Sequence, residues 1–193
     1  MNWKNIILFE HVLFFLAPVL VFISASWSNG SDSNKSDNKL NVGEQFVLNN
    51  VLDSSGEIVN LDFSKADYTM IDLWFRECPP CVKEMEQFEE LLQGKEATVK
   101  VISISVNQPW HWKNVMAGVS GTLTFLKTSI PNWQHLVLGT TDNPRFRNTI
   151  STARVDELEK RYQIGYFPAY FVLNKNGVII QRPESGVAFL KKF

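Results

Sequence analysis

Apolar and polar residues alternate or repeat in patterns that divide residues 41–193 into strands and helices. Residues 46–61 (FVLNNVLDSSGEIVNL) alternate around DSSG, which predicts a β-hairpin with its turn at residues 53–56. Residues 68–75 (YTMIDLWF) are almost continuously apolar, and residues 99–107 (VKVISISVN) are rich in β-branched side chains. We therefore expect two central strands in a sheet that helices cover on both faces.

The stretch between these two strands has a helical period. Four apolar side chains recur there at helical spacing: Val82, Met85, Phe88 and Leu92. Gly94 then fits the left-handed position that ends many helices. The order strand, helix, strand predicts a right-handed crossover between two parallel strands.

Beyond residue 107 the pattern is less regular. PWHWKNVMAGV predicts the start of a helix, residues 133–139 (WQHLVLG) a short strand, and TTDNPRFRNT a loop. ARVDELEKRY predicts a helix, residues 171–173 and 178–180 a hairpin across NKNG, and GVAFLKKF a final helix. With no internal repeat and no second compact segment, residues 41–193 are expected to form one α/β domain.

The N-terminal part of the chain has a different character. Residues 6–27 are apolar apart from two ionisable residues and two serines, and the polar run SNGSDSNKSDNK follows them. Residues 12–23 have the length of a signal-peptide hydrophobic region, whereas residues 6–27 as one helix would rise roughly 33 Å and span a bilayer. Residues 1–28 are therefore interpreted as a signal peptide or a membrane anchor, and residues 29–40 as a flexible linker. Lys4 lies in the short stretch before the apolar segment, which predicts that the residues after 28 lie outside the cytoplasm, on the periplasmic side.

The overall composition is that of an ordinary globular protein. The 193 residues are 45% hydrophobic and 20% charged, and their net charge is −1. This balance lacks the basic excess that phosphate backbones require, so we expect no nucleic acid partner. The chain has 2 cysteines, which are too few for a disulfide scaffold, and a bridge between them would close almost no loop.

The two cysteines, Cys78 and Cys81, lie where the first central strand ends and the predicted helix begins. Unpaired N–H groups and the positive dipole at a helix start stabilise a thiolate, so we expect a lowered pKa for Cys78. Cys78 would be the exposed nucleophile, and Cys81, one turn further, the resolving thiol beneath it. Pro79 and Pro80 suit the first helical turn, where an N–H group would have no partner.

Other uses of the cysteine pair compete with redox exchange. A structural zinc site needs four ligands, and beyond the pair His111 and His135 remain in aromatic surroundings, without zinc-finger spacing. A thiol pair with a distant histidine can also bind copper(I). An inert pair is disfavoured because proximal thiols outside the cytoplasm become oxidised. The favoured interpretation is a redox-active Cys78–Cys81 disulfide with no metal and no other cofactor.

Two stretches together resemble a known family. IDLWFRECPPCVKEM, which begins at Ile71, and YQIGYFPAYFVLNKNG, which contains Pro168, are similar to the thioredoxin superfamily. Within it they resemble the membrane-tethered, extracytoplasmic TlpA/ResA-like thiol-disulfide oxidoreductases, over residues 42–180. The resemblance implies a thioredoxin-like fold with a central mixed β-sheet flanked by helices. It also implies protein thiols or disulfides outside the cytoplasm and a membrane-bound electron donor as partners.

The same resemblance suggests roles for individual residues. Cys78 takes the attacking role and Cys81 the resolving role. Pro168 matches the cis-proline that faces the disulfide and helps to dock an extended substrate, and a simple strand-edge proline is the alternative. Phe167 would offer backbone groups to a partner peptide, and Trp74 of the strand-Trp-CxxC segment is placed with them as a substrate-binding residue. A copper metallochaperone or a non-catalytic interaction domain remain the alternative functions.

Asp72 is an acid within an apolar central strand. Burying it is costly unless it is neutral or paired. It lies six residues before Cys78, where thioredoxins keep a buried aspartate beneath the resolving cysteine. We therefore expect Asp72 to have a raised pKa and to carry the proton of Cys81 during exchange. The structural alternative is a hydrogen-bonded carboxylate at a sheet edge.

Glu77 is a departure from the family pattern, because it replaces the usual tryptophan before the first cysteine. A neighbouring carboxylate disfavours a thiolate, although Arg76 can partly offset its charge. We therefore expect a Cys78 thiol that is less acidic than its helix position suggests, and hence a reductant. Tyr166 stands where thioredoxins commonly have glycine, which predicts a narrower or more aromatic substrate groove.

Overall fold

The structure is a computed structural model that describes residues 41–107, 109–117, 123–127, 130–139 and 163–193. The segments predicted at residues 1–28 and 29–40 lie outside the described residues, as do the TTDNPRFRNT loop and the ARVDELEKRY helix. Among the helices in the described ranges, none is long and apolar enough to cross a membrane.

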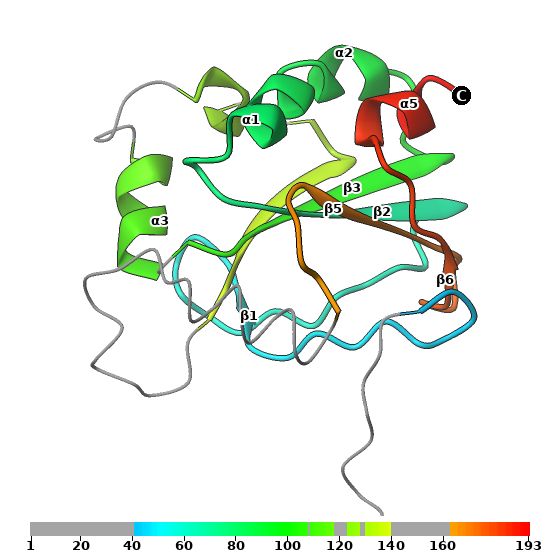
Figure 1. Ribbon diagram of the computed structural model, residues 1–193, viewed down its shortest axis with the longest axis horizontal. Helices are drawn as coiled ribbons and strands as arrows, with labels where there is room; N and C mark the ends of the chain where they lie inside the picture. Colours follow the sequence, from blue (N-terminus) through cyan, green and yellow to red (C-terminus); the bar gives the residue numbers. More distant parts are fainter. Residues whose placement is uncertain (1–40, 108, 118–122, 128–129, 140–162) are drawn as a thin grey trace, which may run out of the picture. The chain divides into compact units, whose positions relative to one another are not determined.

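Six strands of the described chain form one mixed sheet in the order β1-β4-β3-β2-β5-β6 (Figure 1). The strands are β1 (Val51–Leu52), β2 (Tyr68–Trp74), β3 (Val99–Ser105), β4 (Trp133–Leu138), β5 (Ala169–Leu173) and β6 (Ile179–Gln181). β2, β3 and β4 run parallel, while β1, β5 and β6 are antiparallel to their neighbours. The apolar runs therefore form the centre of the sheet, and the predicted α/β fold with a mixed sheet is confirmed.

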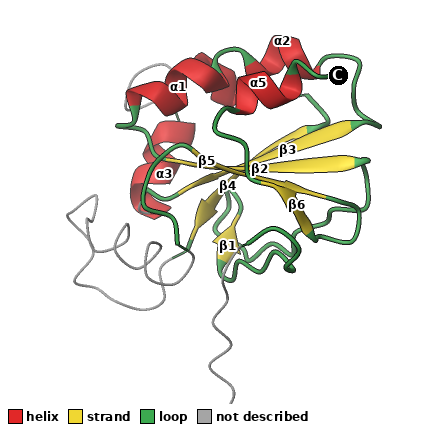
Figure 2. Cartoon of the chain, turned by 45° about the vertical axis from the view of Figure 1, so that its right-hand side comes forward, coloured by secondary structure: helices red, strands yellow, loops and turns green. Residues whose placement is uncertain are grey.

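Helices α1 (Pro79–Met85), α2 (Phe88–Leu92) and α5 (Gly186–Leu190) lie together on one side of the sheet (Figure 2). Helix α3 (Pro109–Met116) and a 3-10 turn at Thr124–Lys127 precede β4. The prediction of one helix through residues 82–92 was wrong, because the helix breaks before α2. There the Gln87 N–H donates to the Glu84 carbonyl at 3.0 Å, and the Gln87 side-chain amide donates to the Lys83 carbonyl at 3.2 Å. In an unbroken helix the Gln87 N–H would bond to Lys83 itself.

Alternate side chains of β2 enter two separate cores. Met70 and Trp74 belong to the cluster that contains both cysteines and the side chains of α1, α2 and α5. Ile71 and Leu73 belong to the cluster on the opposite face. Because side chains alternate along a strand, Asp72 shares the face of Met70 and Trp74, on the side of the sheet that the cysteines occupy.

The hairpins differ from their predictions in extent. Residues 46–61 pair as a hairpin only near the turn, where Leu52 bridges Ile58 and Asp53 Oδ1 accepts the Gly56 N–H at 2.9 Å. The preceding residues pair elsewhere, because Asn50 has a φ of 58° that interrupts the extended backbone. The C-terminal hairpin joins β5 to β6 as predicted, with each strand displaced by up to two residues.

Candidate active site at the Cys78–Cys81 disulfide

The backbone turns from sheet to helix at Cys78. Its φ of −100° and ψ of 94° are extended, and it is the residue that caps α1. Its N–H donates to the Phe75 carbonyl at 3.1 Å, which closes the turn after β2. Pro79 and Pro80 occupy the first positions of the helix, as the sequence predicted. The site is thus held by a rigid strand on one side and a proline-started helix on the other.

Cys78 and Cys81 form a disulfide, with their Cα atoms 5.3 Å apart. The Cys81 N–H also donates to Cys78 Sγ at 3.3 Å. Cys81 is 0% exposed, as expected for the deeper thiol, whereas Cys78 is 4% exposed. The expectation of an exposed Cys78 is therefore wrong for this oxidised form, in which Cys78 belongs to the core cluster.

Asp72 is fully buried, and a chain of hydrogen bonds ends at one of its carboxylate oxygens. Ser103 Oγ donates to Asp72 Oδ2 at 2.8 Å, and Trp133 Nε1 donates to Ser103 Oγ at 2.9 Å. The indole N–H can only donate, so it occupies a lone pair of Ser103 and leaves the hydroxyl hydrogen for Asp72. The other oxygen, Oδ1, has no hydrogen-bond partner within the described part of the chain.

The environment of Asp72 changes its proton affinity. Burial raises the pKa of Asp72 from 3.8 to about 7, the hydrogen bond from Ser103 opposes this rise, and the negative charge of Glu84 adds to it. A carboxyl group with this pKa gains and loses a proton close to neutral pH. It is therefore suited to act as a general acid and base on the cysteine side of the sheet.

A second acid, Glu84, ties α1 to β5 and α5. Its Oε2 atom accepts hydrogen bonds from the Tyr170 hydroxyl at 2.9 Å and from the Val187 N–H at 3.1 Å. Tyr170 pairs directly with Asp72 across β2 and β5. Burial first, and then the charges of both acids, raise the pKa of Tyr170, so its hydroxyl remains a hydrogen-bond donor. A side chain at position 186 would clash, because its β-carbon would lie 2.8 Å from the Tyr170 ring, which explains Gly186.

Pro168 directly precedes β5, and the Phe167–Pro168 peptide bond is cis. Ala169 pairs with Leu73 near the end of β2. Pro168 therefore lies at the end of the sheet where β2 stops and the chain continues to Cys78. The Phe167 ring packs edge-on against Phe75, with the ring centroids 5.4 Å apart. The structure thus brings these two predicted substrate-binding residues to the same end of the sheet as the disulfide.

Trp74 is not at the surface. Its side chain is fully buried, and its ring packs edge-on against Trp112 and Phe125, at centroid distances of 6.3 and 6.2 Å. This burial corrects the expectation that Trp74 contacts a substrate directly. Its place in an aromatic cluster under the active-site turn supports the turn from below instead.

Each oxygen of the Glu77 carboxylate has a polar neighbour. Asn107 Nδ2 donates to Glu77 Oε2 at 3.1 Å, and Arg76 Nη1 lies 4.0 Å from Glu77 Oε1. Sequence reasoning identified Glu77 and Arg76 but missed Asn107, and it missed Ser103 and Glu84 as well. A polar residue just beyond the carboxyl end of a central parallel strand, here two residues after β3, is a pattern that would have pointed to Asn107.

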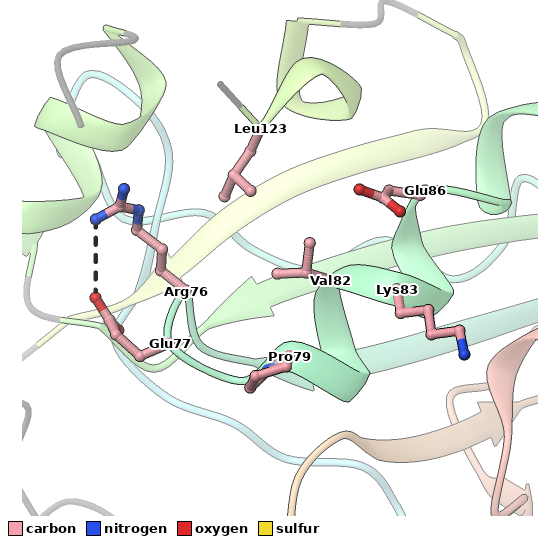
Figure 3. A pocket seen from close by; sticks show the side chains of 7 residues that line it. All are labelled: Arg76, Glu77, Pro79, Val82, Lys83, Glu86 and Leu123. Carbon is pink, nitrogen blue, oxygen red and sulfur yellow. Dashed lines mark ion pairs between the residues drawn. The ribbon is translucent and has the colours of Figure 1, made fainter. Parts of the chain in front are cut away.

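A surface cleft of about 610 Å³ lies beside the disulfide turn (Figure 3). Both charged and apolar side chains line it: Arg76, Glu77, Pro79, Val82, Lys83, Glu86 and Leu123. Figure 3 shows Glu77 extending toward Arg76 and away from Pro79, while Val82 and Leu123 line the middle. The cleft therefore combines apolar side chains with charges of both signs, and Glu77 and Pro79 in its lining are the chain neighbours of Cys78.

Within the described ranges, no three His, Cys, Asp or Glu side chains gather closely enough to hold a metal ion. Of the two histidines considered as ligands, His111 has no described side chain, whereas the ring of His135 lies against Trp133 at 4.7 Å. Burial lowers the pKa of His135 to about 4. Its imidazole is therefore neutral at pH 7.

Comparisons with known proteins agree with this geometry. Residues 41–186 match the family model described as Redoxin. A stretch of 69 residues is 34% identical to the thiol-disulfide oxidoreductase ResA of Halalkalibacterium halodurans. This stretch covers 35% of the present chain and 39% of the length of that relative.

Two solved structures with a similar fold come from Bacteroides species. One is a thiol:disulfide interchange protein from Bacteroides sp., with a TM-score of 0.54 and 19% identity over 79% of this chain and 88% of that chain. Another is the thioredoxin domain of a thiol-disulfide oxidoreductase from Bacteroides vulgatus, with a TM-score of 0.54 and 19% identity over 80% and 99%. These similarities confirm the thioredoxin-like fold. The chain therefore belongs to the Redoxin family, and part of it is similar to ResA.

Proposed function

We propose that this protein is a thiol-disulfide oxidoreductase that reduces disulfides in partner proteins through Cys78 and Cys81. The observation that carries the proposal is the Cys78–Cys81 disulfide at the junction of β2 and α1, on the same side of the sheet as the buried acid Asp72. Membership of the Redoxin family and the similarity to ResA support it.

In the proposed reaction the reduced protein begins with a Cys78 thiolate. Its sulfur attacks one sulfur of a partner disulfide, which forms a mixed disulfide and releases the other partner sulfur as a thiolate that takes a proton. The Cys81 thiolate then attacks Cys78 Sγ, breaks the mixed disulfide and releases the second partner thiol. Two electrons have passed to the partner, and the Cys78–Cys81 disulfide has formed. The Cys81 N–H, which donates to Cys78 Sγ, favours the thiolate form of Cys78.

Asp72 has the proposed role of proton carrier for Cys81. Cys81 is fully buried, so its proton needs an acceptor inside the protein before its sulfur can attack. Asp72 lies on the same face of β2 as the cluster that contains Cys81, and its pKa of about 7 allows it to take this proton near neutral pH.

Partner binding is proposed at the segment before β5. The Phe167 backbone would pair with an extended partner chain, and Pro168 would lie against the mixed disulfide. Both residues are partly exposed at the sheet edge near the active-site turn. We also propose that residues 1–28 target the domain to the outside of the cytoplasm, where a membrane-bound electron donor reduces it again. The apolar residues 6–27 and Lys4 support this location.

The test is reduction of insulin by the purified full chain with dithiothreitol as electron source. The protein is expected to accelerate insulin precipitation, and Cys78→Ser is expected to abolish the acceleration. If the protein does not accelerate insulin reduction, the better explanation would be a copper(I)-binding thiol pair or a non-catalytic domain that only binds another protein.

A trapping experiment tests the roles of the two thiols. Cys81→Ser removes the resolving thiol, so partner proteins are expected to remain attached to Cys78 and to be released by a reductant. Cys78→Ser serves as the matched control and is expected to trap far less. Accumulation of partners on Cys81 in that control would reverse the assigned roles.

A further inference from the structure

The side chain of Asn107 joins the end of β3 to the segment that precedes Cys78. Its Oδ1 atom accepts hydrogen bonds from the Arg76 backbone N–H at 2.9 Å and from Ser105 Oγ at 2.8 Å. Its Nδ2 atom donates to Glu77 Oε2 at 3.1 Å. Asn107 is 1% exposed, and its bond to Ser105 is buried, whereas its bonds to Arg76 and Glu77 are partly buried. Burial strengthens such a network when its members are satisfied.

The orientation of the Asn107 amide is determined by its partners. The Arg76 N–H can only donate, so it must face the amide oxygen. The amide nitrogen then faces Glu77, whose carboxylate can accept. A flipped amide would place a donor against the Arg76 donor and an acceptor against the Glu77 acceptor. Asn107 is therefore matched to a carboxylate at position 77.

The same side chain continues the pairing of β2 with β3. The Val106 N–H donates to the Trp74 carbonyl at 2.8 Å, where β2 ends. At the next step the Asn107 oxygen accepts the Arg76 N–H in place of a backbone carbonyl. The residues just before Cys78 are thereby attached to the rigid centre of the sheet, and the Glu77 carboxylate is attached with them.

We propose that Asn107 is a positioning residue that holds the Glu77 carboxylate in a fixed place beside the active-site turn and so determines how strongly its charge acts on the Cys78 thiol. Without this bond the carboxylate loses its attachment to the end of β3, and a charge that spends more time in solvent acts more weakly because its field is screened. The inference rests on the proposed function, because it concerns the same thiol. The other charged side chains around the cleft are Arg76, Lys83 and Glu86. Two further acids, Asp72 on β2 and Glu84 on α1, lie on the cysteine side of the sheet.

The test is a double-mutant cycle on the pKa of Cys78. The full chain with Cys81→Ser keeps one thiol, so the pH dependence of its alkylation by iodoacetamide reports Cys78 alone. Glu77→Gln is expected to lower the thiol pKa by about half a unit when Asn107 is present. In the Asn107→Asp background the same substitution is expected to lower it by less than half as much. Asp has the size of Asn and keeps an acceptor for Arg76, but its carboxylate cannot donate to Glu77.

Two further variants separate positioning from general loosening. Asn107→Ala repeats the cycle without an added charge, and each variant is checked by thermal unfolding. Ser105→Ala is the matched control, because it removes the two hydrogen bonds between Ser105 and Asn107 and leaves the bond to Glu77. It is expected to leave the thiol pKa unchanged.

Three results would overturn the proposal. Glu77→Gln could change the thiol pKa equally in both backgrounds, or it could leave the thiol pKa unchanged or raise it when Asn107 is present. The third is a shift of the thiol pKa in Ser105→Ala. Thiol alkylation requires no protein substrate. A failure of the insulin assay would therefore contradict the oxidoreductase function without affecting the measured thiol pKa values. Likewise, a failed double-mutant cycle would contradict the role of Asn107 without affecting the oxidoreductase function.

Discussion

Two carboxylates near the disulfide lie in contrasting environments. Asp72 is fully buried in the sheet, where one hydroxyl donates to it, whereas Glu77 lies at the surface with a side chain that is 36% exposed. Burial makes Asp72 a group that exchanges a proton near pH 7. Glu77, which is held by Asn107 and lies near Arg76, acts through the position of its charge. In the proposed mechanism the same chemical group thus supplies a proton carrier in one place and an electrostatic influence in the other.

The largest expected effect is on stability in Asp72→Asn. In the native state the pKa of Asp72 is about 7, against 3.8 for the ordinary group. The stability contributed by this raised pKa is present below pH 3.8 and is lost as the pH rises through about 7. A shift of this size corresponds to roughly 4 kcal/mol, and Asn does not titrate. Between pH 4 and 8 the free energy of unfolding of Asp72→Asn should therefore rise relative to the native chain by up to that amount.

Urea unfolding of the oxidised proteins at a series of pH values measures this difference. His135, whose pKa is lowered, titrates in the same range, but it is present in both chains and cancels in the difference. Parallel stability curves for the two chains would show that Asp72 has an ordinary pKa.

Ser103→Ala is expected to have the next largest effect. The Ser103 hydroxyl donates to Asp72 Oδ2 and favours the charged carboxylate, so its removal should raise the pKa of Asp72 by about one unit more. To measure this shift, the free energy of unfolding of Ser103→Ala is compared with that of the double mutant Ser103→Ala/Asp72→Asn across the pH range. The pH midpoint of the difference between them reports the pKa of Asp72. Ser103→Thr keeps the hydroxyl and is expected to retain the original midpoint. An unchanged midpoint in Ser103→Ala would contradict the hydrogen-bond assignment.

Glu77→Gln tests the surface side of the comparison. Removal of a charge that opposes the thiolate should stabilise the reduced protein and make the disulfide more oxidising, with an equilibrium constant against glutathione changed about threefold. Glu90→Gln, on α2, is the matched control and should leave the constant unchanged. A disulfide that became more reducing in Glu77→Gln would reverse the role of this charge.

The smallest expected effect is that of Glu84→Gln on Asp72. The Glu84 charge raises the pKa of Asp72, so the neutral amide should lower its midpoint by a few tenths of a unit. Gln keeps an oxygen that can accept from Tyr170 and Val187. Glu86→Gln, at the exposed residue that follows α1, should not shift the midpoint, and equal shifts in both variants would exclude a specific contribution from Glu84.

Much of the fold was predictable because hydrophobic burial leaves a clear pattern in the sequence. The apolar runs at residues 68–75 and 99–107 have one explanation, a pair of strands covered on both faces, and the structure shows them paired in parallel. The cysteines at the end of the first run and the two prolines gave the place of the disulfide and the start of α1.

Features that depend on contacts between distant residues were not predictable in the same way. The chain of hydrogen bonds from Trp133 through Ser103 to Asp72 joins three strands, and no local pattern marks it. The burial of Trp74 depends on Trp112 and Phe125, which come from later segments. Asn107 acquires its role only when β3 lies beside β2 and brings its amide to Arg76 and Glu77.

The pH dependence of mixed-disulfide resolution tests the contrast between the two carboxylates most directly. A chromophoric thiol bound to Cys78 is released when Cys81 attacks, so stopped-flow absorbance gives the rate of that step across neutral pH. The native chain should show an inflection near pH 7, the pKa of Asp72. Asp72→Asn should lose the inflection and be slower by roughly 100-fold, whereas Glu77→Gln should keep it. Identical profiles for the native chain and Asp72→Asn would contradict the assignment of Asp72 as proton carrier.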